Sequence, residues 1–337
     1  MASAAIRTGV VGATGYTGAE LARLLSGHPH FDLNFLSSRK NAGEDFTRLY
    51  PRFQDEIELQ LEHPDRLSEA DLELLFLAVP HTISMQIVPQ IDLESTVVVD
   101  LAADYRFPSV PDFNATYETE HTDVANNKKA VYGLTEHNRE KIAAAALVAN
   151  PGCYATAALL PLITLVQEDL VVEPFFIDAK SGISGAGRKP SATTTFVARN
   201  EDIWPYKVGE HRHQAEIAAH LPDSELEPFF VPHVIPVDRG IEAALYCRTA
   251  SSADFSRIEA SLKRFCAQHR LLRYRSEPAG IKSVANTPYC DITVIEKDGR
   301  LVVFSCLDNL LKGAASQAIQ NANLVFDFDS STGLIRR

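Results

Sequence analysis

The stretch GVVGATGYTGAELARLL, residues 9–25, decides the fold. An apolar run over 6–12 predicts a short strand, and leucines at helical spacing predict a helix over 16–28. A glycine turn with the spacing GxxGxxG separates the two, and its glycines are Gly12, Gly15 and Gly18. Such a turn brings free backbone N–H groups close to a pyrophosphate at a helix start. The stretch therefore predicts a dinucleotide-binding turn, with a purely structural turn as the alternative.

Apolar runs alternate with helical patterns through the first part of the chain. A second strand is predicted at 31–40, and continuous apolar runs lie at 71–80, 95–105 and 145–153. Runs of this kind are typical of parallel strands that are buried on both faces. A chain of 337 residues is long for one hydrophobic core. We therefore expect an α/β fold whose first domain, residues 1–150, is a doubly wound Rossmann-type domain.

The second half has a different character, with β-branched and aromatic residues in its strands. Two strands flank Asp298-Gly299, which is a strong hairpin signal, and a helix is expected over 253–269. This pattern predicts an α+β domain with a mixed sheet over 151–308, which would carry catalysis and oligomerisation. The segment 309–328 is rich in small residues and predicts a helix, and we expect 309–337 to pack back onto the first domain.

Composition and charge exclude several classes of protein. The chain is 45% hydrophobic and 23% charged, which is ordinary for a globular protein, and its net charge of −12 disfavours nucleic-acid and membrane-surface roles. No apolar stretch is long enough to span a bilayer, and the N-terminus lacks the pattern of a secretory signal. The five cysteines are scattered without a CxxC pair, so neither a disulfide framework nor a zinc site is expected. We expect a cytoplasmic protein.

The residues after the second predicted strand indicate whether the chain binds NAD or NADP(H). An acidic residue about 20 positions past the glycines would bind the ribose 2′-hydroxyl of NAD. Here Ser38, Arg39 and Lys40 occupy that place, and Arg39 lies 21 residues after Gly18. Hydroxyls and cations suit a 2′-phosphate, so NADP(H) is favoured over NAD. The alternative is a solvated basic loop.

One cysteine stands where a strand, a turn and a helix meet. The stretch NPGCYATAALL, residues 150–160, predicts that Cys153 starts a helix directly after a Pro-Gly turn. The dipole of a helix N-terminus favours the thiolate and lowers the pKa of a thiol placed there, which suits a nucleophile. Free cysteines are also commonly buried and inert, and the local sequence leaves both interpretations open.

A histidine pair offers the base that a nucleophilic thiol needs. The stretch HRHQAEI contains His211, His213 and Glu216. One imidazole near the thiol would shuttle a proton at neutral pH. A metal site is disfavoured because a well-placed third ligand is missing, and a surface histidine pair is the remaining alternative.

Two further stretches suit anions. The glycine-rich loop SGISGAGRKPS, residues 181–191, would expose backbone donors around Ser184 and Gly185, while Arg188 and Lys189 add charge. Such a loop suits a phosphate or the nicotinamide end of a cofactor, with a flexible hinge as the alternative. Arg106 follows a predicted strand end, where it would clamp a carboxylate or a phosphate.

Together these motifs resemble a known family. The stretches that carry the resemblance are GATGYTGAEL, DLAADYRF, YGLTE, NPGCYATA, SGISGAGRK, HRHQAEI, PHVIPVDRGI and DNLLKGAASQAIQ, in order from residue 12 to about 321. The chain resembles the N-acetyl-γ-glutamyl-phosphate reductases, the NADPH-dependent enzymes of arginine biosynthesis. The resemblance implies that Cys153 is the nucleophile, that it forms a thioester, and that His213, more than His211, is the acid/base. The amide of Asn150 and the Cys153 N–H are candidate oxyanion donors.

The remaining site residues and the assembly follow from the same resemblance. The implied cofactor-binding residues are Gly12, Ala13, Thr14, Gly15, Tyr16, Thr17, Gly18, Ser38, Arg39, Lys40, Ser184, Gly185 and Asn309. The implied substrate-binding residues are Arg106, Arg188, Lys189 and Glu216, and no metal is expected. Ala155 and Ala215 stand where many relatives have proline, and neither touches a reacting atom. A homodimer or homotetramer is implied.

Three rival functions remain open at this point. Two are related acyl-phosphate reductases: aspartate-semialdehyde dehydrogenase, and the reductase of carrier-bound aminoadipyl phosphate in lysine synthesis. The HRH and DYRF motifs favour the arginine-pathway enzyme over the first and do not strongly exclude the second. The third rival is a non-catalytic NADPH sensor on the same fold. Its disadvantage is that this chain keeps Cys153, His213 and Arg106 together.

Overall fold

The strand, turn and helix predicted around the three glycines form in the structure. Strand β1 covers Ile6–Val11, and helix α1 covers Tyr16–Ser26. The computed structural model describes residues 5–223 and 225–335. Its contacts divide the chain into two units, the first from Met1–Pro151 with Ala314–Arg337 and the second from Gly152–Gly313. Each unit is built around its own seven-stranded sheet.

The sheet of the first unit is entirely parallel. Its order is β3-β2-β1-β4-β5-β7-β6. The other strands are β2 (Phe31–Ser37), β3 (Leu61–Glu62), β4 (Leu74–Leu77), β5 (Val97–Asp100), β6 (Val131–Tyr132) and β7 (Leu147–Ala149). Strand β1 pairs with β2 on one side and with β4 on the other, so the strand order reverses there. In open α/β sheets, ligands bind beyond the carboxyl ends of the strands at such a reversal.

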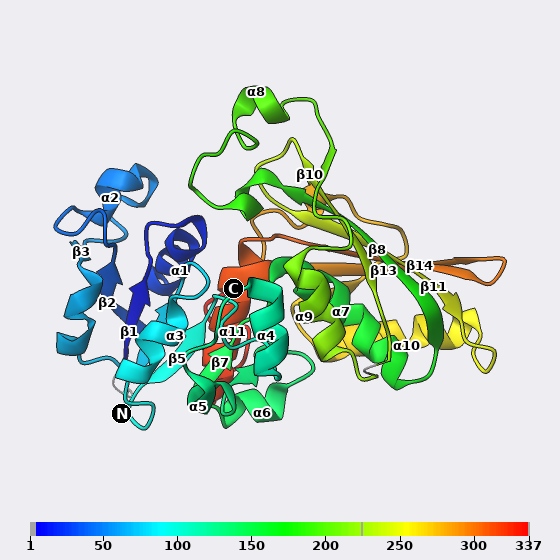
Figure 1. Cartoon of the computed structure of the whole chain (residues 1–337), viewed down its shortest axis with the longest axis horizontal. Coiled ribbons are helices and arrows are strands. Elements are labelled where there is room, and N and C mark those ends of the chain that lie inside the picture. Colours follow the sequence, from blue (N-terminus) through cyan, green and yellow to red (C-terminus); the bar gives the residue numbers. More distant parts are fainter. Residues whose placement is uncertain (1–4, 224, 336–337) are drawn as a thin grey trace. The chain divides into compact units, whose positions relative to one another are not determined.

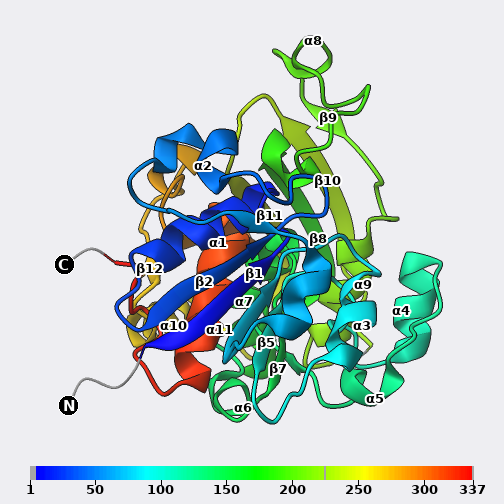
Figure 2. The same cartoon turned by 90° about the vertical axis from the view of Figure 1, so that its left-hand side faces the viewer.

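Helices connect these strands, and most of them are short. They are α2 (Phe46–Leu49), α3 (Ser84–Ile87), α4 (Val110–Tyr117), α5 (Val124–Asn127) and α6 (Arg139–Ala143), with 3₁₀ turns at Pro51–Phe53, Pro64–Glu69 and Val88–Gln90, and α11 (Ser316–Val325) joins the unit from the end of the chain. Figure 2 shows α1 and α11 beside the strands of this sheet. Helix α1 packs on β1 and β2, α11 packs on β5, and the two helices contact each other. The four residues of β4 are all buried, as expected of a parallel strand covered on both faces.

The second unit is an α+β domain with the predicted mixed sheet. The strand order is β12-β13-β14-β11-β8-β10-β9. The strands are β8 (Val171–Gly182), β9 (Trp204–Pro205), β10 (Phe229–Ile235), β11 (Ile241–Thr249), β12 (Leu272–Tyr274), β13 (Cys290–Lys297) and β14 (Arg300–Leu307). Two of its pairings, β8 with β10 and β12 with β13, are parallel, and the others are antiparallel.

Three helices cover one face of this second sheet: α7 (Cys153–Gln167), α9 (Arg212–His220) and α10 (Phe255–Gln268). The unit also contains α8 (Phe196–Arg199), 3₁₀ turns at Ile183–Ala186 and Ile281–Ser283, and a π-helix at Leu311–Ala315. Helix α7 is the centre of the unit, because it packs on β8, β11 and β14 and also on α9 and α10. Residues 154–165 of α7 are all buried. Figure 1 shows α7, α9 and α10 along one side of the sheet, whereas α8 extends away from it.

Two local predictions can be compared with the structure. The hairpin turns at Asp298-Gly299, where both residues have positive φ angles of 55° and 72°, and this prediction is confirmed. The helix predicted over 309–328 begins later, because the chain first forms the π-helix and enters α11 only at Ser316. Among the described residues, no helix has the length and apolarity that crossing a membrane requires.

Candidate active site

The glycine turn has the geometry of a nucleotide cradle. Gly12 has φ +86°, and a Cβ there would lie 2.3 Å from the carbonyl oxygen of Ala78. A Cβ on Gly18 would lie 2.3 Å from the Gly12 carbonyl oxygen, so the close packing of strand and helix requires glycine. A Cβ on Gly15 would meet only the Gly12 oxygen, at 3.6 Å, so the N-terminus of α1 is open to an approaching ligand. These contacts fit a bound dinucleotide.

The remaining predicted residues of this cradle lie around the carboxyl ends of β1 and β2. The N–H groups of Gly12 and Ala13 donate to the Ser37 carbonyl oxygen at 3.1 and 3.0 Å. The hydroxyls of Thr14 and Ser38 are 3.1 Å apart. Tyr16, Arg39 and Lys40 are exposed, whereas Thr17 is half-buried. The structure therefore brings the predicted pyrophosphate turn and the predicted 2′-phosphate residues to one edge of the first sheet.

Cys153 is the first residue of α7 and is half-buried. Its preceding residue, Gly152, is the N-cap and supplies no side chain to satisfy the helix N–H groups. The positive end of a 15-residue helix therefore faces the thiol, which stabilises an anionic sulfur. The other four cysteines are buried. Burial raises the pKa of Cys247 to about 12, so that thiol is inert.

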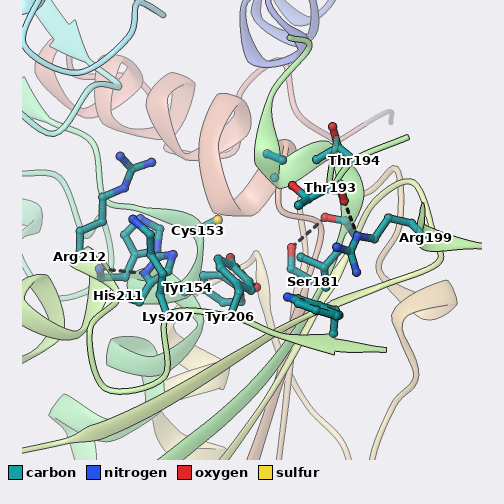
Figure 3. A pocket seen from close by; sticks show the side chains of 16 residues that line it. Cys153, Tyr154, Ser181, Thr193, Thr194, Arg199, Tyr206, Lys207, His211 and Arg212 are labelled. Atoms are coloured by element: carbon teal, nitrogen blue, oxygen red, sulfur yellow. Dashed lines mark hydrogen bonds between the residues drawn. The ribbon is translucent and has the colours of Figure 1, made fainter. Parts of the chain in front are cut away.

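A pocket of about 420 Å³ in the second unit opens onto Cys153. Figure 3 shows the sulfur atom with His211, Arg212, Lys207 and two tyrosines toward one side and with Ser181, Thr193, Thr194 and Arg199 toward the other. Three cations line the pocket, and none of its described lining residues is Asp or Glu. The volume suits a small molecule, and the charge suits an anion. An anionic substrate is therefore compatible with this chain in spite of its net negative charge.

His211 is the N-cap of α9. Its Nδ1 accepts the backbone N–H of His213 at 3.1 Å, so the ring proton of the neutral imidazole lies on Nε2. Burial, followed by the charges of Arg212 and Lys207, lowers the pKa of His211 to about 3. The His211 imidazole is therefore neutral across the physiological pH range, and its hydrogen bond to the His213 N–H caps the N-terminus of α9.

His213 lies against the residue that precedes the thiol. A Cβ on Gly152 would lie 2.5 Å from His213 Nε2, so glycine is required for this approach. Glu216 is fully buried, and its Oε1 accepts the Gly152 N–H at 2.8 Å while its Oε2 lies 4.0 Å from His213 Nε2. The Glu216 carboxylate thus connects the turn that precedes Cys153 with the imidazole of His213. The substrate-binding role of Glu216 stays a prediction, and its observed contacts link the Gly152-Cys153 turn to the His213 imidazole.

Two tyrosines complete this side of the pocket. The Tyr206 hydroxyl donates to the Tyr154 hydroxyl at 3.4 Å, and Tyr154 donates to the His233 carbonyl oxygen at 3.2 Å. The Tyr154 ring packs edge-on against both histidine rings, with centroids 5.7 Å apart in each case. Burial raises the pKa of both phenols, so they are neutral hydrogen-bond donors.

Arg106 and Asn150 belong to the first unit, and their contacts differ from the predicted ones. The buried Arg106 guanidinium donates to the carbonyl oxygens of Asn150, at 2.8 Å, and Leu101, at 2.7 Å. The Asn150 amide donates to the Ala314 carbonyl oxygen at 3.3 Å and accepts from Asn321 at 3.1 Å. These groups brace the ends of β5 and β7. The prediction that Arg106 clamps an anion stays a prediction, and in this structure two of its guanidinium nitrogens, Nε and one Nη, donate to backbone carbonyls.

The predicted residues of the second glycine-rich loop fall into two groups, one near Asn309 and one exposed. Ser184, Gly185 and Asn309 come together, since Asn309 Nδ2 donates to the Ser184 hydroxyl at 3.0 Å and a Cβ on Gly185 would lie 4.0 Å from the same nitrogen. Arg188 and Lys189 are exposed and are not among the residues that line the pocket.

The cations of the pocket come from other parts of the second unit than this loop, and they are not among the residues predicted from the sequence. They are Arg199, Lys207 and Arg212. Arg212 carries one visible signal, its place between the two histidines. Arg199 ends α8 and Lys207 lies between β9 and α9, and neither residue belongs to one of the recognised motifs.

The comparison with known proteins places this geometry in a family. A semialdehyde dehydrogenase NAD binding domain matches residues 7–145, and a semialdehyde dehydrogenase dimerisation domain matches residues 153–309. The N-acetyl-gamma-glutamyl-phosphate reductase of Desulforudis audaxviator is 42% identical, with 98% of each chain covered. The chain belongs to this reductase family. The reductase of Campylobacter curvus is also 42% identical, over 98% of this chain and 97% of the relative.

Solved structures support the fold of this family member. Aspartate semialdehyde dehydrogenase II from Vibrio cholerae superposes with a TM-score of 0.76 at 16% identity, covering 96% of this chain and 99% of that one. Aspartate semialdehyde dehydrogenase with NADP from Candida albicans superposes with a TM-score of 0.71 at 15% identity, covering 95% and 98%. The predicted α/β fold and the family resemblance are confirmed. Membership makes the chain an oxidoreductase that uses a nicotinamide cofactor.

Proposed function

We propose that the chain reduces N-acetyl-glutamyl 5-phosphate to N-acetyl-glutamate 5-semialdehyde and phosphate with NADPH, as a step of arginine biosynthesis. The observation that carries the proposal is Cys153 at the N-terminus of α7, in a pocket that also contains His213 and three cations. Relatives with the name of this activity are 42% identical over nearly the whole chain.

The first chemical step uses the thiolate. The sulfur of Cys153 attacks the acyl carbon, and the carbon–oxygen bond to the phosphate breaks with its electron pair leaving on the phosphate. The product is a thioester on Cys153. The helix N-terminus stabilises the thiolate before attack, and the pocket cations balance the charge of the departing phosphate. Arg199, Lys207 and Arg212 replace Arg106, Arg188 and Lys189 as our candidates for this role.

The second step needs a proton at the carbonyl oxygen. A nicotinamide cofactor, held by the glycine turn of the first unit, supplies the hydride for this step when it is bound. His213 donates a proton to the oxygen as the thioester becomes a thiohemiacetal, and it recovers that proton when the aldehyde leaves. Glu216 keeps the imidazole beside the Gly152-Cys153 turn during both events, because it contacts each. The Cys153 N–H is a candidate oxyanion donor.

A coupled assay tests the proposed substrate. Purified protein is given N-acetyl-glutamate 5-semialdehyde, phosphate and NADP⁺, and NADPH is followed by absorbance. We expect turnover that depends on phosphate, and at most traces with aspartate semialdehyde, because the relatives at 42% identity are named for the N-acetyl-glutamyl-phosphate activity. Preference for aspartate semialdehyde would contradict the proposal. Activity only on a carrier-bound aminoadipyl substrate would establish the lysine-type rival instead.

The proposed preference for NADPH depends on Arg39. Its side chain is exposed at the end of β2, next to Ser38 and Lys40. A charge-assisted hydrogen bond contributes about 1.5–3 kcal/mol, so Arg39→Ala should raise the KM for NADPH by about 10- to 100-fold and leave the KM for NADH nearly unchanged. Arg139→Ala, at an exposed arginine of α6, is the matched control. Equal changes for both cofactors would remove the 2′-phosphate assignment.

We also propose that the protein is a cytoplasmic homodimer or homotetramer. The face of the second sheet opposite its helices carries exposed apolar side chains on four strands: Phe176, Phe229, Tyr246 and Ile295. A patch of this kind on one sheet supports association with a second copy, and the family model over 153–309 is described as a dimerisation domain. Sedimentation equilibrium measures the assembly, and a monomer at micromolar concentration would contradict the proposal.

A further inference from the structure

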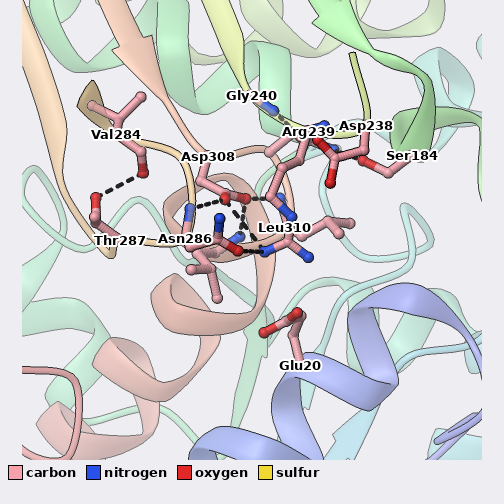
Figure 4. Close-up of polar contacts among 12 residues, drawn as sticks. Glu20, Ser184, Asp238, Arg239, Gly240, Val284, Asn286, Thr287, Asp308 and Leu310 are labelled. Atoms are coloured by element: carbon pink, nitrogen blue, oxygen red, sulfur yellow. Dashed lines mark hydrogen bonds and ion pairs between the residues drawn. The ribbon is translucent and has the colours of Figure 1, made fainter. Parts of the chain in front are cut away.

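A buried carboxylate, Asp308, organises the chain immediately after β14 (Figure 4). Its Oδ1 accepts the N–H groups of Leu310, at 2.8 Å, and Leu311, at 3.2 Å. The Leu311 N–H also donates to the Asp308 carbonyl oxygen at 3.2 Å, so the carboxylate adds to the first turn of the π-helix Leu311–Ala315. Its Oδ2 accepts the Asn286 N–H at 2.7 Å. One side chain therefore starts the π-helix and ties it to a neighbouring loop.

Arg239 supplies the charge that keeps this carboxylate buried. Its Nη1 lies 3.4 Å from Asp308 Oδ2 and donates to the Asn286 side-chain oxygen at 2.9 Å. Both side chains of the ion pair are at least nine-tenths buried. Removing one partner of such a pair leaves an uncompensated charge in the interior, so the pair behaves as a unit.

The next residue, Asn309, extends the network to the wall of the pocket. Its Oδ1 accepts the Gly240 N–H at 2.7 Å, and its Nδ2 donates to the Ser184 hydroxyl at 3.0 Å. Gly240 in turn accepts the Gly182 N–H at 2.9 Å through its carbonyl oxygen. Gly182 lines the pocket that holds the thiol. The same dipeptide thus anchors both the π-helix and the glycine-rich loop.

The π-helix lies directly against the thiol residue through Gly313. The Gly313 N–H donates to the Asp308 carbonyl oxygen at 2.9 Å, which closes the wide turn. A Cβ on Gly313 would lie 2.8 Å from the Cβ of Cys153 and 3.2 Å from Leu307 Cδ1. The backbone of the π-helix therefore limits where the Cys153 side chain can lie. Single π-helical turns are rare and occur frequently at functional sites.

We propose that Asp308, paired with Arg239, is a positioning residue for the Cys153 thiol and acts through the π-helix and Gly313. The inference rests on the proposed role of Cys153 as nucleophile. A displacement of about 1 Å at a reacting group costs about 100-fold in rate, so a small shift of this helix is sufficient to change turnover.

Gly313→Ala tests the contact, and Gly280→Ala is its matched control. A Cβ on Gly280 would meet nothing within 4 Å. Iodoacetamide is used to label Cys153 in the folded protein, and the modified peptide is identified by mass spectrometry. We expect Gly313→Ala to slow alkylation by about 10-fold or more and to lower kcat by about 100-fold with KM within about threefold. Gly280→Ala should leave the three quantities unchanged.

Asp308→Asn tests the origin of the effect, and it decides the question if Gly313→Ala does not fold. It keeps the size of the side chain but removes the charge that faces Arg239. We expect kcat and the alkylation rate to fall together, and Asp308→Asn with Arg239→Gln to be no worse than Asp308→Asn alone, because the pair acts as a unit. Folded variants with wild-type alkylation and kcat would overturn the inference. Alkylated wild type that still turned over would instead overturn the nucleophile itself, so the two failures are distinguishable.

Discussion

Cys153→Ser is expected to abolish phosphate-dependent reduction of NADP⁺ by the semialdehyde, lowering kcat by about 10⁴-fold or more. The thiolate supplies both the attacking electron pair and the leaving group of the thioester. A serine hydroxyl is far harder to ionise at neutral pH and forms an ester that is a poorer hydride acceptor. The helix N-terminus that faces Cys153 stabilises an anion there and does not substitute for the sulfur.

The control for this substitution is another cysteine of the same unit. Cys266→Ala removes a buried thiol on α10, and Cys266 is not among the residues that line the pocket. It should retain full kcat, although its thermal stability falls somewhat because a buried side chain is shortened. Binding of NADPH to Cys153→Ser, followed by nucleotide fluorescence, should match the wild type because the glycine turn is untouched. Normal turnover by Cys153→Ser would remove the proposed mechanism.

The sequence predicted those parts of the molecule whose cause is local. The nucleotide turn was predictable from Gly12 and Gly18, because a Cβ at either position would clash with backbone atoms and only glycine fits there. The Asp298-Gly299 pair predicts a hairpin because both residue types adopt positive φ angles readily, as they do here. The thiol at a helix start was visible because Pro151 and Gly152 separate a short strand from a helical pattern.

Other parts of the site depend on contacts that no local pattern records. Arg106 looked like an anion clamp because it follows a strand end, but its guanidinium satisfies two backbone carbonyls of the same unit. Arg199, at the end of α8, and Lys207, between β9 and α9, line the pocket although neither belongs to a recognised motif. Glu216 contacts Gly152, which lies 64 residues earlier in the chain. Contacts between residues so far apart in the chain are determined by tertiary packing, and the local sequence around each residue does not predict them.

The spacing of the two histidines shows the same limit. A strand would have placed His211 and His213 on one face, and a helix would have separated them. The chain does neither, because His211 stops one residue short of α9 as its cap, and His213 enters the first turn. Both therefore line the pocket while only one of them is committed to the start of the helix.

His213→Asn is expected to lower kcat by about 10²- to 10⁴-fold, the usual contribution of a positioned acid/base. His211→Asn is the matched substitution in the same motif, and it should cost less than about 10-fold. Asparagine is among the best N-cap residues, so its side chain can still accept the His213 N–H and start α9. The two variants thus separate proton transfer from helix capping.

The pH profile distinguishes the two histidines independently of the size of the rate loss. Because burial lowers the pKa of His211 to about 3, this imidazole is neutral throughout pH 5 to 8 and cannot produce an inflection there. In the oxidative direction the base must be neutral to accept a proton, so kcat/KM should rise with pH as the acid/base histidine loses its proton. The histidine part of that rise should persist in His211→Asn and vanish in His213→Asn. If it vanished in His211→Asn and persisted in His213→Asn, the acid/base would be His211, and the contact of Glu216 with His213 would have to be explained by packing alone.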